Sequence, residues 1–377
     1  MRMTPLPSAT GWNRLRRFDW MMMVAATALM GVGICFIYSA SFHGDPLRVA
    51  PYYRKQLIWD GLGLLVCILM GMTDYRRILR GAWVWYGLAV GLLLLAIVVG
   101  VSIRGAQRWL CILGVYVQPA ELAKIVLVAV LARYLGSSVR RVGSWRIVLT
   151  ATLTTGIPFV LIFRQPDLGT AAALIPVLLI MLYVAGVPAR ILVFLCILGL
   201  LFAPLGWLVL DEYQTNRILF FLDPGKDPLG AGWNKIQSEI AVGSGGLWGK
   251  GFLKGTQNIL GFLPRSVAPT DFIFSVIAEE AGFIGAAVIL VLYSVILSAC
   301  LRTALSARDV AGKLLCVGVA VLLFFHVFVN IGMTVGLCPI TGLPLPLVSY
   351  GGSVTVALMA ALGMVQSVRV FATRIYG

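Results

Sequence analysis

Charged side chains are scarce in this chain of 377 residues, in which 12% of the residues are charged and 60% are hydrophobic. A soluble domain typically carries about a quarter charged residues, so this composition excludes an ordinary soluble protein. Apolar runs of roughly 18 or more residues recur along the chain, and a helix satisfies its own backbone in lipid. The short alternating segments of a membrane β-barrel are missing. The sequence therefore predicts an all-α polytopic membrane protein.

Acidic residues are fewer than basic ones: 15 Asp and Glu stand against 30 Lys and Arg, which gives a formal net charge of +15. Such an excess can indicate nucleic-acid binding. Here, however, the basic residues form short clusters at the ends of the apolar runs, as expected for membrane orientation and contact with anionic lipid. We therefore expect membrane lipids as partners and exclude nucleic acid.

The seven cysteines show neither a CxxC motif nor the spacing of a metal site, so no metal ligands are predicted. Five of them lie inside apolar runs, where cysteine behaves as a small hydrophobic residue. Cys111 and Cys338 lie near predicted helix ends on the same side of the membrane, where they could pair.

Ten apolar segments predict about ten transmembrane helices, which form a single transmembrane domain over residues 1–377. The first apolar stretch, from Trp20 to Ile37, exceeds the roughly 7–15-residue core of a cleaved signal peptide, so we expect this helix to be retained. The predicted helices lie near 18–38, 53–73, 82–102, 118–136, 146–163, 168–186, 190–210, 271–301, 313–337 and 352–371.

Lys and Arg are distributed unequally between the two sets of loops. The segments that flank the helices on one side of the membrane, which include Arg14, Arg76 and Arg308, hold sixteen Lys and Arg residues. The short loops on the opposite side hold six. Because these residues accumulate on the cytoplasmic side, both chain ends are predicted to be cytoplasmic. The one long loop, about 211–270 between helices seven and eight, then lies outside. We expect it to be functional, with an amphipathic helix over 233–241 on the membrane surface.

Charged residues at the membrane edge are energetically costly, so each of them is a candidate for a functional role. In Gln118-Pro-Ala-Glu-Leu-Ala-Lys124, Glu121 suits either a helix cap or an ion pair with Lys124, three residues further on. A proton relay is an equally good interpretation of the pair. Asp167 in Gln165-Pro-Asp-Leu-Gly169 is either a helix cap or part of a phosphate site formed by outward helix N-termini.

Asp271 lies where the long loop meets the eighth helix. From the bare sequence an N-cap is the plainer interpretation, and a catalytic acid is the alternative. Glu279 and Glu280 lie deeper and need partners, for which Arg217 and Lys124 are candidates. The segment from Thr341 to Ser353 combines prolines and glycines, so its extended backbone must line a cavity or be buried in protein.

The outer loop that contains Arg104, Gln107, Arg108 and Trp109 is either an interfacial anchor or a contact for an anionic lipid headgroup. Taken together, these residues leave two classes of function open. One is an outward-facing enzyme that acts on a lipid-linked substrate. The other is a transporter or flippase, because buried ion pairs and broken helices also suit alternating access.

The motifs nevertheless resemble the SEDS family (shape, elongation, division and sporulation proteins), and within it the RodA branch. The resemblance covers nearly the whole chain and rests on motifs in a fixed order. They are Gly105-Ala-Gln-Arg-Trp109, Gln118 to Lys124, Gln165 to Thr170, Asp227 to Gly232, Ser244 to Gly251, Gly255-Thr-Gln257, Thr270 to Phe274, Asn330-Ile-Gly-Met333 and Pro344 to Ser353.

The resemblance implies a peptidoglycan glycosyltransferase that polymerises lipid II, an undecaprenyl-pyrophosphate-linked substrate, at the outer face of the cytoplasmic (inner) membrane. It implies a class B penicillin-binding protein and other elongation-complex proteins as partners. Asp271 matches the essential acid of the family, and Glu121 and Lys124 match its charged pair. One departure is the stretch from Leu263 to Asp271, which is longer than usual and carries Arg265.

An inverting glycosyl transfer needs one base for the acceptor hydroxyl and positive charge for the pyrophosphate leaving group. No nucleotide cofactor is expected, and a divalent cation can share the charge although no ligand cluster is visible. Lipid II translocation and a scaffolding role stay as alternatives. We predict Asp271 as the catalytic base, with support or substrate binding by Gln107, Arg108, Trp109, Glu121, Lys124, Asp167, Lys250 and Ser349.

The resemblance implies that the partner's membrane segment docks on the eighth and ninth helices. In the ninth helix, His326 and Asn330 are four residues apart and can hydrogen-bond inward on a shared face. We expect Val319, Leu323 and Val327 to form the opposite face, available to another helix.

Overall fold

The structure is a computed structural model, which describes residues 14–42, 49–103, 106–112, 114–138, 144–207, 212–223 and 231–372. Each of the ten predicted membrane helices is present within a few residues of its expected bounds, so the predicted helical membrane fold is confirmed. These helices are α2 (Trp20–Ser41), α3 (Tyr52–Met72), α5 (Ala82–Val99), α6 (Pro119–Ser137), α7 (Trp145–Phe163), α8 (Leu168–Ala185), α9 (Ala189–Trp207), α13 (Ile273–Ser306), α14 (Val310–Thr334) and α15 (Gly352–Ala372).

Eight of these helices are long and apolar enough to cross a membrane. The other two are α6, which carries Glu121, Lys124 and Arg133, and α9, whose described apolar part runs from Ala189 to Phe202. The remaining helices are shorter: α4 (Tyr75–Arg80), α10 (Glu212–Leu222), α11 (Ala231–Ser244) and α12 (Thr256–Ile259).

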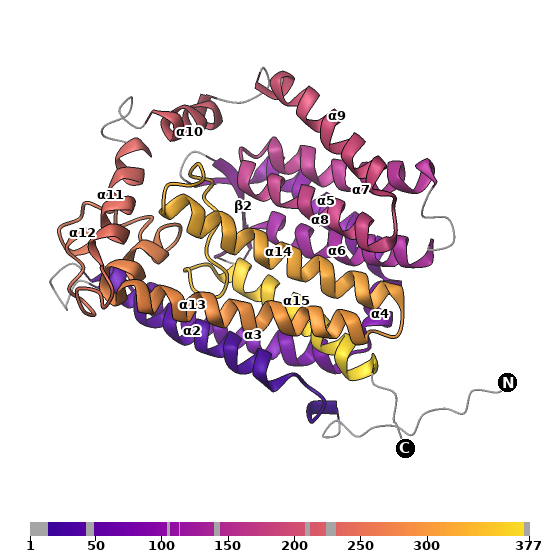
Figure 1. The fold of residues 1–377 in the computed structure, drawn as a ribbon, viewed down its shortest axis with the longest axis horizontal. Coiled ribbons are helices and arrows are strands. Elements are labelled where there is room, and N and C mark those ends of the chain that lie inside the picture. Colours follow the sequence, from indigo (N-terminus) through magenta and orange to yellow (C-terminus); the bar gives the residue numbers. More distant parts are fainter. Residues whose placement is uncertain are drawn as a thin grey trace.

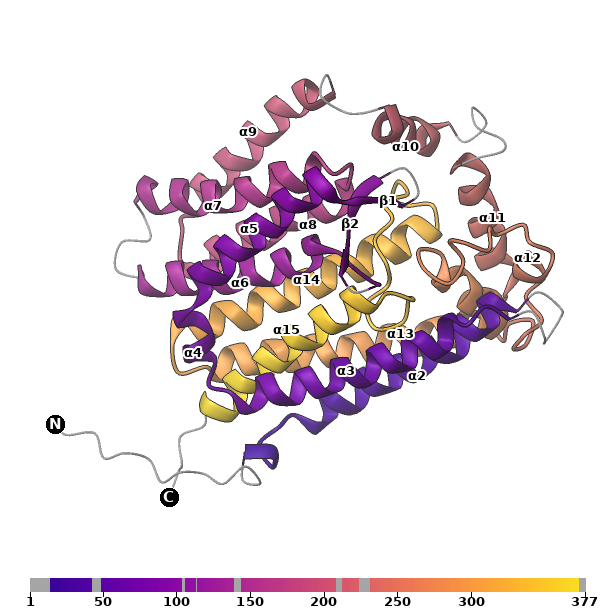
Figure 2. The same cartoon turned by 180° about the vertical axis from the view of Figure 1, so that it is seen from behind.

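The helices pack side by side into one bundle, with α14 and α15 in its interior and α9 and α10 along one edge (Figures 1 and 2). Most of α14 is buried, because it packs against α6, α8 and α13. The helix α15 packs along α3. The interior is filled by aliphatic side chains and many alanines, and such small residues let helices approach closely in a membrane protein.

A small antiparallel sheet follows α5 and was not predicted. Its strands β1 (Val101–Ile103), β2 (Ala106–Ile112) and β3 (Val115–Val117) pair in the order β1-β2-β3. The predicted third helix was too long at its end: α5 ends at Val99, and Gly100 has extended backbone. The β-branched Val101 and Ile103 then favour a strand. The sheet carries Arg108 and Trp109 over the end of the bundle.

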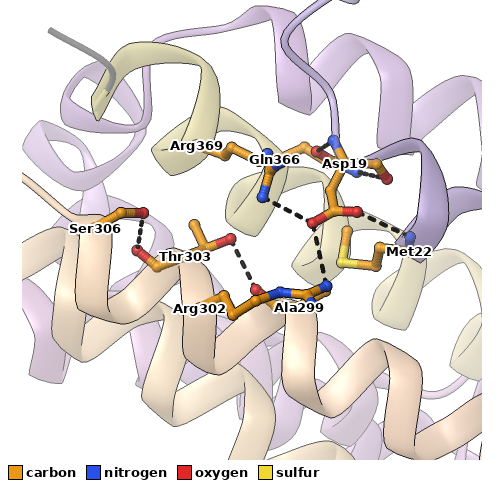
Figure 3. A network of polar contacts seen from close by, with 8 residues as sticks. All are labelled: Asp19, Met22, Ala299, Arg302, Thr303, Ser306, Gln366 and Arg369. Carbon is orange, nitrogen blue, oxygen red and sulfur yellow. Dashed lines mark hydrogen bonds and ion pairs between the residues drawn. The ribbon is translucent and has the colours of Figure 1, made fainter.

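The end of the bundle where α2 begins and α15 ends is closed by a polar network around the buried Asp19 (Figure 3). Its carboxylate caps α2 through the Met22 N–H (3.2 Å) and pairs with Arg369 (2.8 Å) and Arg302 (3.8 Å). Gln366 exchanges two hydrogen bonds with the Asp19 backbone. The network therefore ties α2, α13 and α15 together at this end. The chain ends predicted to be cytoplasmic lie outside the described residues.

The helix predicted over 233–241 is present as α11, but it does not simply lie on the membrane surface. The buried Ser238 hydroxyl shares a hydrogen bond with Ser275 of α13 (2.7 Å) and donates one to the Thr334 carbonyl of α14 (2.9 Å). One face of α11 therefore packs on the bundle, because its small polar residues find partners there.

The two deep acids of α13 do not pair with Arg217 or Lys124, so that prediction was wrong. Glu279 forms an ion pair with Lys250 (2.7 Å), and Glu280 accepts hydrogen bonds from Ser39 (2.6 and 2.7 Å). The glycine-rich run folds directly onto α13 here. A Cβ on Gly245 would lie 1.9 Å from the Ala278 carbonyl oxygen, so glycine at 245 permits this close approach.

The face of α14 that was expected to be free is buried, so this part of the docking prediction was wrong. Val319, Leu323 and Val327 are 2%, 1% and 7% exposed. The reason is helical geometry: a spacing of seven residues places Val319 within about 20° of His326, on the inward face. The exposed side chains of α14 are instead Phe324 and Phe328.

Candidate functional site

A cavity of about 480 Å³ lies at the end of the bundle opposite the Asp19 network. Its walls come from the first turns of α3, α6, α8 and α15, from strands β2 and β3, and from the turn that precedes α13. The lining residues include Lys55, Trp59, Arg108, Trp109, Tyr116, Gln118, Glu121, Asp167, Thr170, Thr270, Asp271, Gly342 and Tyr350.

Asp271 is half-buried and lines this cavity. It does not cap α13, because the helix begins at Ile273 and its N-cap residue is Phe272, with no side-chain cap. The capping interpretation of Asp271 was therefore wrong. The longer stretch with Arg265 does not displace it: a turn in which the Val267 carbonyl accepts from the N–H groups of residues 270–272 delivers Asp271 to the cavity wall.

The backbone around Asp271 is held by side chains from two other segments. Asn330 of α14 donates from Nδ2 to the Asp271 carbonyl (2.9 Å) and to the Leu343 carbonyl (2.7 Å). The Ser349 hydroxyl donates to the Thr270 carbonyl (2.5 Å) and accepts from the Leu345 N–H (2.8 Å). Ser349 therefore does not line the cavity but fixes the residue next to Asp271. The extended segment that begins at Thr341 meets both expectations, since Gly342 and Tyr350 line the cavity while Leu345 and Leu347 are buried in protein.

The predicted pair on α6 is present. Lys124 Nζ lies 2.8 Å from Glu121 Oε1, and the two residues are 1% and 2% exposed. Gln118 is the N-cap residue and Glu121 caps nothing that the structure describes, which favours the ion-pair interpretation over the cap. His326 of α14 is a third member, with Nε2 2.9 Å from Lys124 Nζ. Because an ammonium only donates, Nε2 accepts and the ring proton is on Nδ1.

Glu121 lines the cavity, whereas Lys124 lies behind it in the protein. The inward face predicted for α14 is confirmed, since His326 reaches Lys124 and Asn330 reaches the Asp271 backbone. The helix α14 therefore supports two of the acids of the cavity, Glu121 through Lys124 and Asp271 through its backbone.

Asp167 has two roles at the start of α8. Its Oδ1 accepts from the Thr170 N–H (3.2 Å), which is the predicted cap. Its Oδ2 pairs with Arg108 of the sheet (2.9 Å) and accepts from Gln118 Nε2 of α6 (3.0 Å). The carboxylate thus occupies the N-terminus of α8, so this helix end is less available to a phosphate than the sequence indicated. The pairing instead fixes Arg108 at the cavity wall.

Some predicted residues lie away from the cavity. Lys250 donates hydrogen bonds to Glu279 and to the Thr256 hydroxyl. Gln107 is exposed on β2, where it pairs with Ser102 of β1. Cys111 and Cys338 are both free thiols, so the suggested disulfide is not formed. Arg104 and the part of the 227–232 motif before Ala231 lie outside the described residues.

Other residues in or beside the cavity were missed because they lie outside the motifs. Lys55 and Trp59 come from α3, where the spacing of four that places both on one helix face was the available signal. Arg217 comes from α10: a Cβ on Gly342 would lie 3.4 Å from its Nη1 and 3.8 Å from Asp271 Oδ2. A guanidinium and the carboxylate of Asp271 therefore flank the same glycine.

The cavity combines three carboxylates with the cations Lys55 and Arg108. Glu121 and Asp167 are each engaged in an ion pair inside the protein. Among the residues that the structure describes, no group of three or more His, Cys, Asp or Glu is placed to hold a metal ion. The arrangement can bind an anionic, polar ligand, and it presents an acid to that ligand beside fixed cations.

The fold and this cavity define a polytopic membrane protein with a charged binding site at one end of its helical bundle. The chain belongs to the FtsW/RodA/SpoVE family, which is described as cell cycle proteins and whose sequence profile matches residues 19–374.

Known relatives agree along the whole chain. Peptidoglycan glycosyltransferase MrdB of Escherichia coli K12 is 38% identical over 369 residues, which cover 95% of each protein. A chain from the solved structure "Structural coordination of polymerization and crosslinking by a peptidoglycan synthase complex" is 34% identical, with a TM-score of 0.78 and coverage of 94% and 98%. Rod shape determining protein RodA of Thermus thermophilus is 31% identical, with a TM-score of 0.68 and coverage of 93% and 96%.

Proposed function

We propose that this protein is a peptidoglycan glycosyltransferase that polymerises lipid II into β-1,4 glycan strands during cell elongation. The observation that carries the proposal is Asp271, whose carboxylate faces a charged cavity while its backbone is held by Asn330 and its neighbour Thr270 by Ser349. Such fixed positioning suits a catalytic acid or base. The names of the relatives, one of which is a peptidoglycan glycosyltransferase, support the reaction class.

The reaction inverts the anomeric carbon, because an α-linked pyrophosphate is replaced by a β-linked sugar. The oxygen of the acceptor 4-hydroxyl attacks the anomeric carbon of the donor sugar. Asp271 accepts the proton that this hydroxyl loses. The bond from that carbon to the phosphate oxygen breaks, and undecaprenyl pyrophosphate leaves with the electron pair. Arg108 and Lys55 stabilise the charge that develops on this leaving group. Lys124 does not line the cavity, so its role is to hold Glu121 in place.

The cavity faces outward if the loops rich in Lys and Arg are cytoplasmic. The end of the bundle that carries Asp19 and α4 is then inside, and the Asp271 end is outside. This orientation suits a substrate whose sugars are on the outer face and whose lipid tail stays in the membrane. A flippase would instead need charged groups along a path through the bundle. The acids and cations of the Asp271 cavity are confined to its end of the bundle, which favours the enzyme.

The first test is polymerisation of labelled lipid II by the purified protein, alone and with its class B penicillin-binding partner. We expect glycan strands from at least the complex, because the cavity holds both an acid and cations for the leaving group. Fluorescent lipid II in proteoliposomes supplies the comparison. Translocation of lipid II across the bilayer without any glycan product, by protein with native unfolding behaviour, would contradict the enzymatic function and favour the flippase.

We also propose that the partner's membrane segment docks on α13. Its outer half carries exposed Ile284, Val288 and Val291, whose spacing of four and three residues places them on one face. An exposed apolar helix face of this kind can pack closely against the membrane helix of a partner.

Cysteine crosslinking tests this docking surface. We expect efficient crosslinks to the partner's membrane segment from Ile284→Cys, Val288→Cys and Val291→Cys. Leu65→Cys and Leu69→Cys on α3 are exposed controls that should not crosslink, and Leu323→Cys on α14 is a buried one. If crosslinks appear only from α2, α3 or α5, the docking surface lies elsewhere, while the enzymatic function would be unaffected.

A further inference from the structure

A second cavity, of about 340 Å³, lies at the opposite end of the bundle from Asp271. We call it the α4 pocket, because α4 forms one wall, the end of α6 a second and the start of α14 a third. Its lining residues are Tyr75, Arg76, Leu79, Arg80, Arg133, Gly136, Ser137, Asp309, Val310 and Ala311. Three arginines and one aspartate give this lining a net charge of +2.

The single acid of the α4 pocket is already satisfied by protein donors. Asp309 Oδ1 accepts from the Gly312 N–H (2.7 Å), and Oδ2 accepts from the Tyr75 hydroxyl (2.8 Å) and from Arg76 Nε (3.1 Å). Burial alone would raise the pKa of Asp309, but these hydrogen bonds hold the pKa below its ordinary value. The carboxylate therefore stays ionised and neutralises Arg76 only.

The other two arginines keep donors for a ligand. Arg133 uses Nη1 for two bonds, to the carbonyls of Leu79 and Arg80 at the end of α4, which fix its guanidinium in the pocket wall. Its Nη2 and Nε have no protein partner among the described residues. Arg80 is exposed, and its side chain also makes no hydrogen bond or ion pair among the described residues. A guanidinium presents its donors in a planar fork that matches phosphate oxygens.

Aromatic residues place the α4 pocket at the level of the lipid headgroups. The Trp83 ring contacts the ring of Tyr134, the neighbour of Arg133, with centroids 6.4 Å apart. Trp85 packs against Gly81, the residue after α4. Tryptophan gathers at the membrane interface. Val84, between the two tryptophans, and Leu88, one turn further along α5, are exposed and offer an apolar surface for acyl chains.

We propose that the α4 pocket binds the phosphate of a phospholipid whose headgroup carries a net negative charge. Arg80 and Arg133 hold the phosphodiester, and the acyl chains lie along α5. A zwitterionic headgroup binds less well, because its ammonium group would meet the same arginines. Basic pockets between membrane helices on the cytoplasmic side are suited to such lipids. The site is separate from the Asp271 cavity, so it stands whether or not the proposed reaction is correct.

The test is native mass spectrometry of the purified full-length protein, titrated with dioleoyl-phosphatidylglycerol or dioleoyl-phosphatidylethanolamine. We expect one phosphatidylglycerol to bind more tightly than the rest, with no equivalent phosphatidylethanolamine. Arg80→Gln should weaken this binding about fivefold, since a basic residue near anionic lipid contributes about 1 kcal/mol. Arg302→Gln is the matched control, because it removes the same charge at the same end but outside the pocket.

Arg133→Gln gives a second variant, whose folding is followed by its unfolding midpoint because Arg133 also caps α4. Inorganic phosphate at millimolar concentration should not displace the lipid. Full displacement by inorganic phosphate would show an anion site without lipid selectivity and overturn the proposal. Equal loss of binding in Arg80→Gln and Arg302→Gln would overturn it too, because the effect would then be general surface charge.

Discussion

Replacing Asp271 by asparagine is expected to reduce lipid II polymerisation by about 10²–10⁴-fold, the usual effect of removing a general base. Asparagine keeps the shape of the side chain but cannot accept the proton of the acceptor hydroxyl. The start of α13 and the fixed backbone of the site should be kept, because the helix begins at Ile273 without a side-chain cap and the contacts from Asn330 and Ser349 reach backbone carbonyls. The measurement is the rate of glycan synthesis per folded protein, with the unfolding midpoint recorded in parallel.

Asp309→Asn is the matched control for this change, since Asp309 is an aspartate at the other end of the bundle. Its loss weakens the cap of α14 and the contact with Arg76, so stability falls while glycan synthesis by the folded fraction stays near normal. Asp271→Glu keeps the carboxylate but moves it by one methylene, and an intermediate rate is expected. Near-normal synthesis by well-folded Asp271→Asn would show that Asp271 is not the base.

The helices could be predicted from the sequence because burial in lipid acts on every residue of a long apolar run. The small sheet could not, since its three strands are short and sit between two strongly apolar helices. The sequence also could not show which face of α14 is exposed to lipid. A nearly uncharged helix gives no pattern that separates lipid from protein, and the side that faces inward was set by His326 and Asn330.

At the site, only contacts between residues that are close together on one helix could be predicted from the sequence. Glu121 and Lys124 are three residues apart on one helix, so their pairing followed from geometry. The acids Glu279 and Glu280 found partners in the glycine-rich loop and in α2, which depends on tertiary folding. Lys55 lines the cavity from α3, and Arg217 of α10 lies beside Gly342 near Asp271, so the tertiary fold brings both to the site from outside the motifs.

The buried pair of Glu121 and Lys124 should show strong coupling in a double-mutant cycle of Glu121→Gln and Lys124→Met. Removing Lys124 leaves the Glu121 charge without its ammonium partner at 2% exposure, and breaking a buried pair costs about 3–5 kcal/mol. Removing both charges together avoids that penalty, so the double variant should be more stable than Lys124→Met alone. His326 would then lose the ammonium group that contacts its Nε2.

Two readouts separate the structural and catalytic contributions of this pair. The unfolding midpoint gives the coupling energy, expected on the order of 1–3 kcal/mol for groups in direct contact. Glycan synthesis should stay low in the double variant even when stability recovers, because Glu121 lines the cavity that holds Asp271. Glu279→Gln is the control, since Glu279 is equally buried in an ion pair but lies away from the cavity, and its activity should follow stability alone. A fully additive cycle would show that Glu121 and Lys124 act independently, and recovery of synthesis with stability would leave the pair a purely structural role.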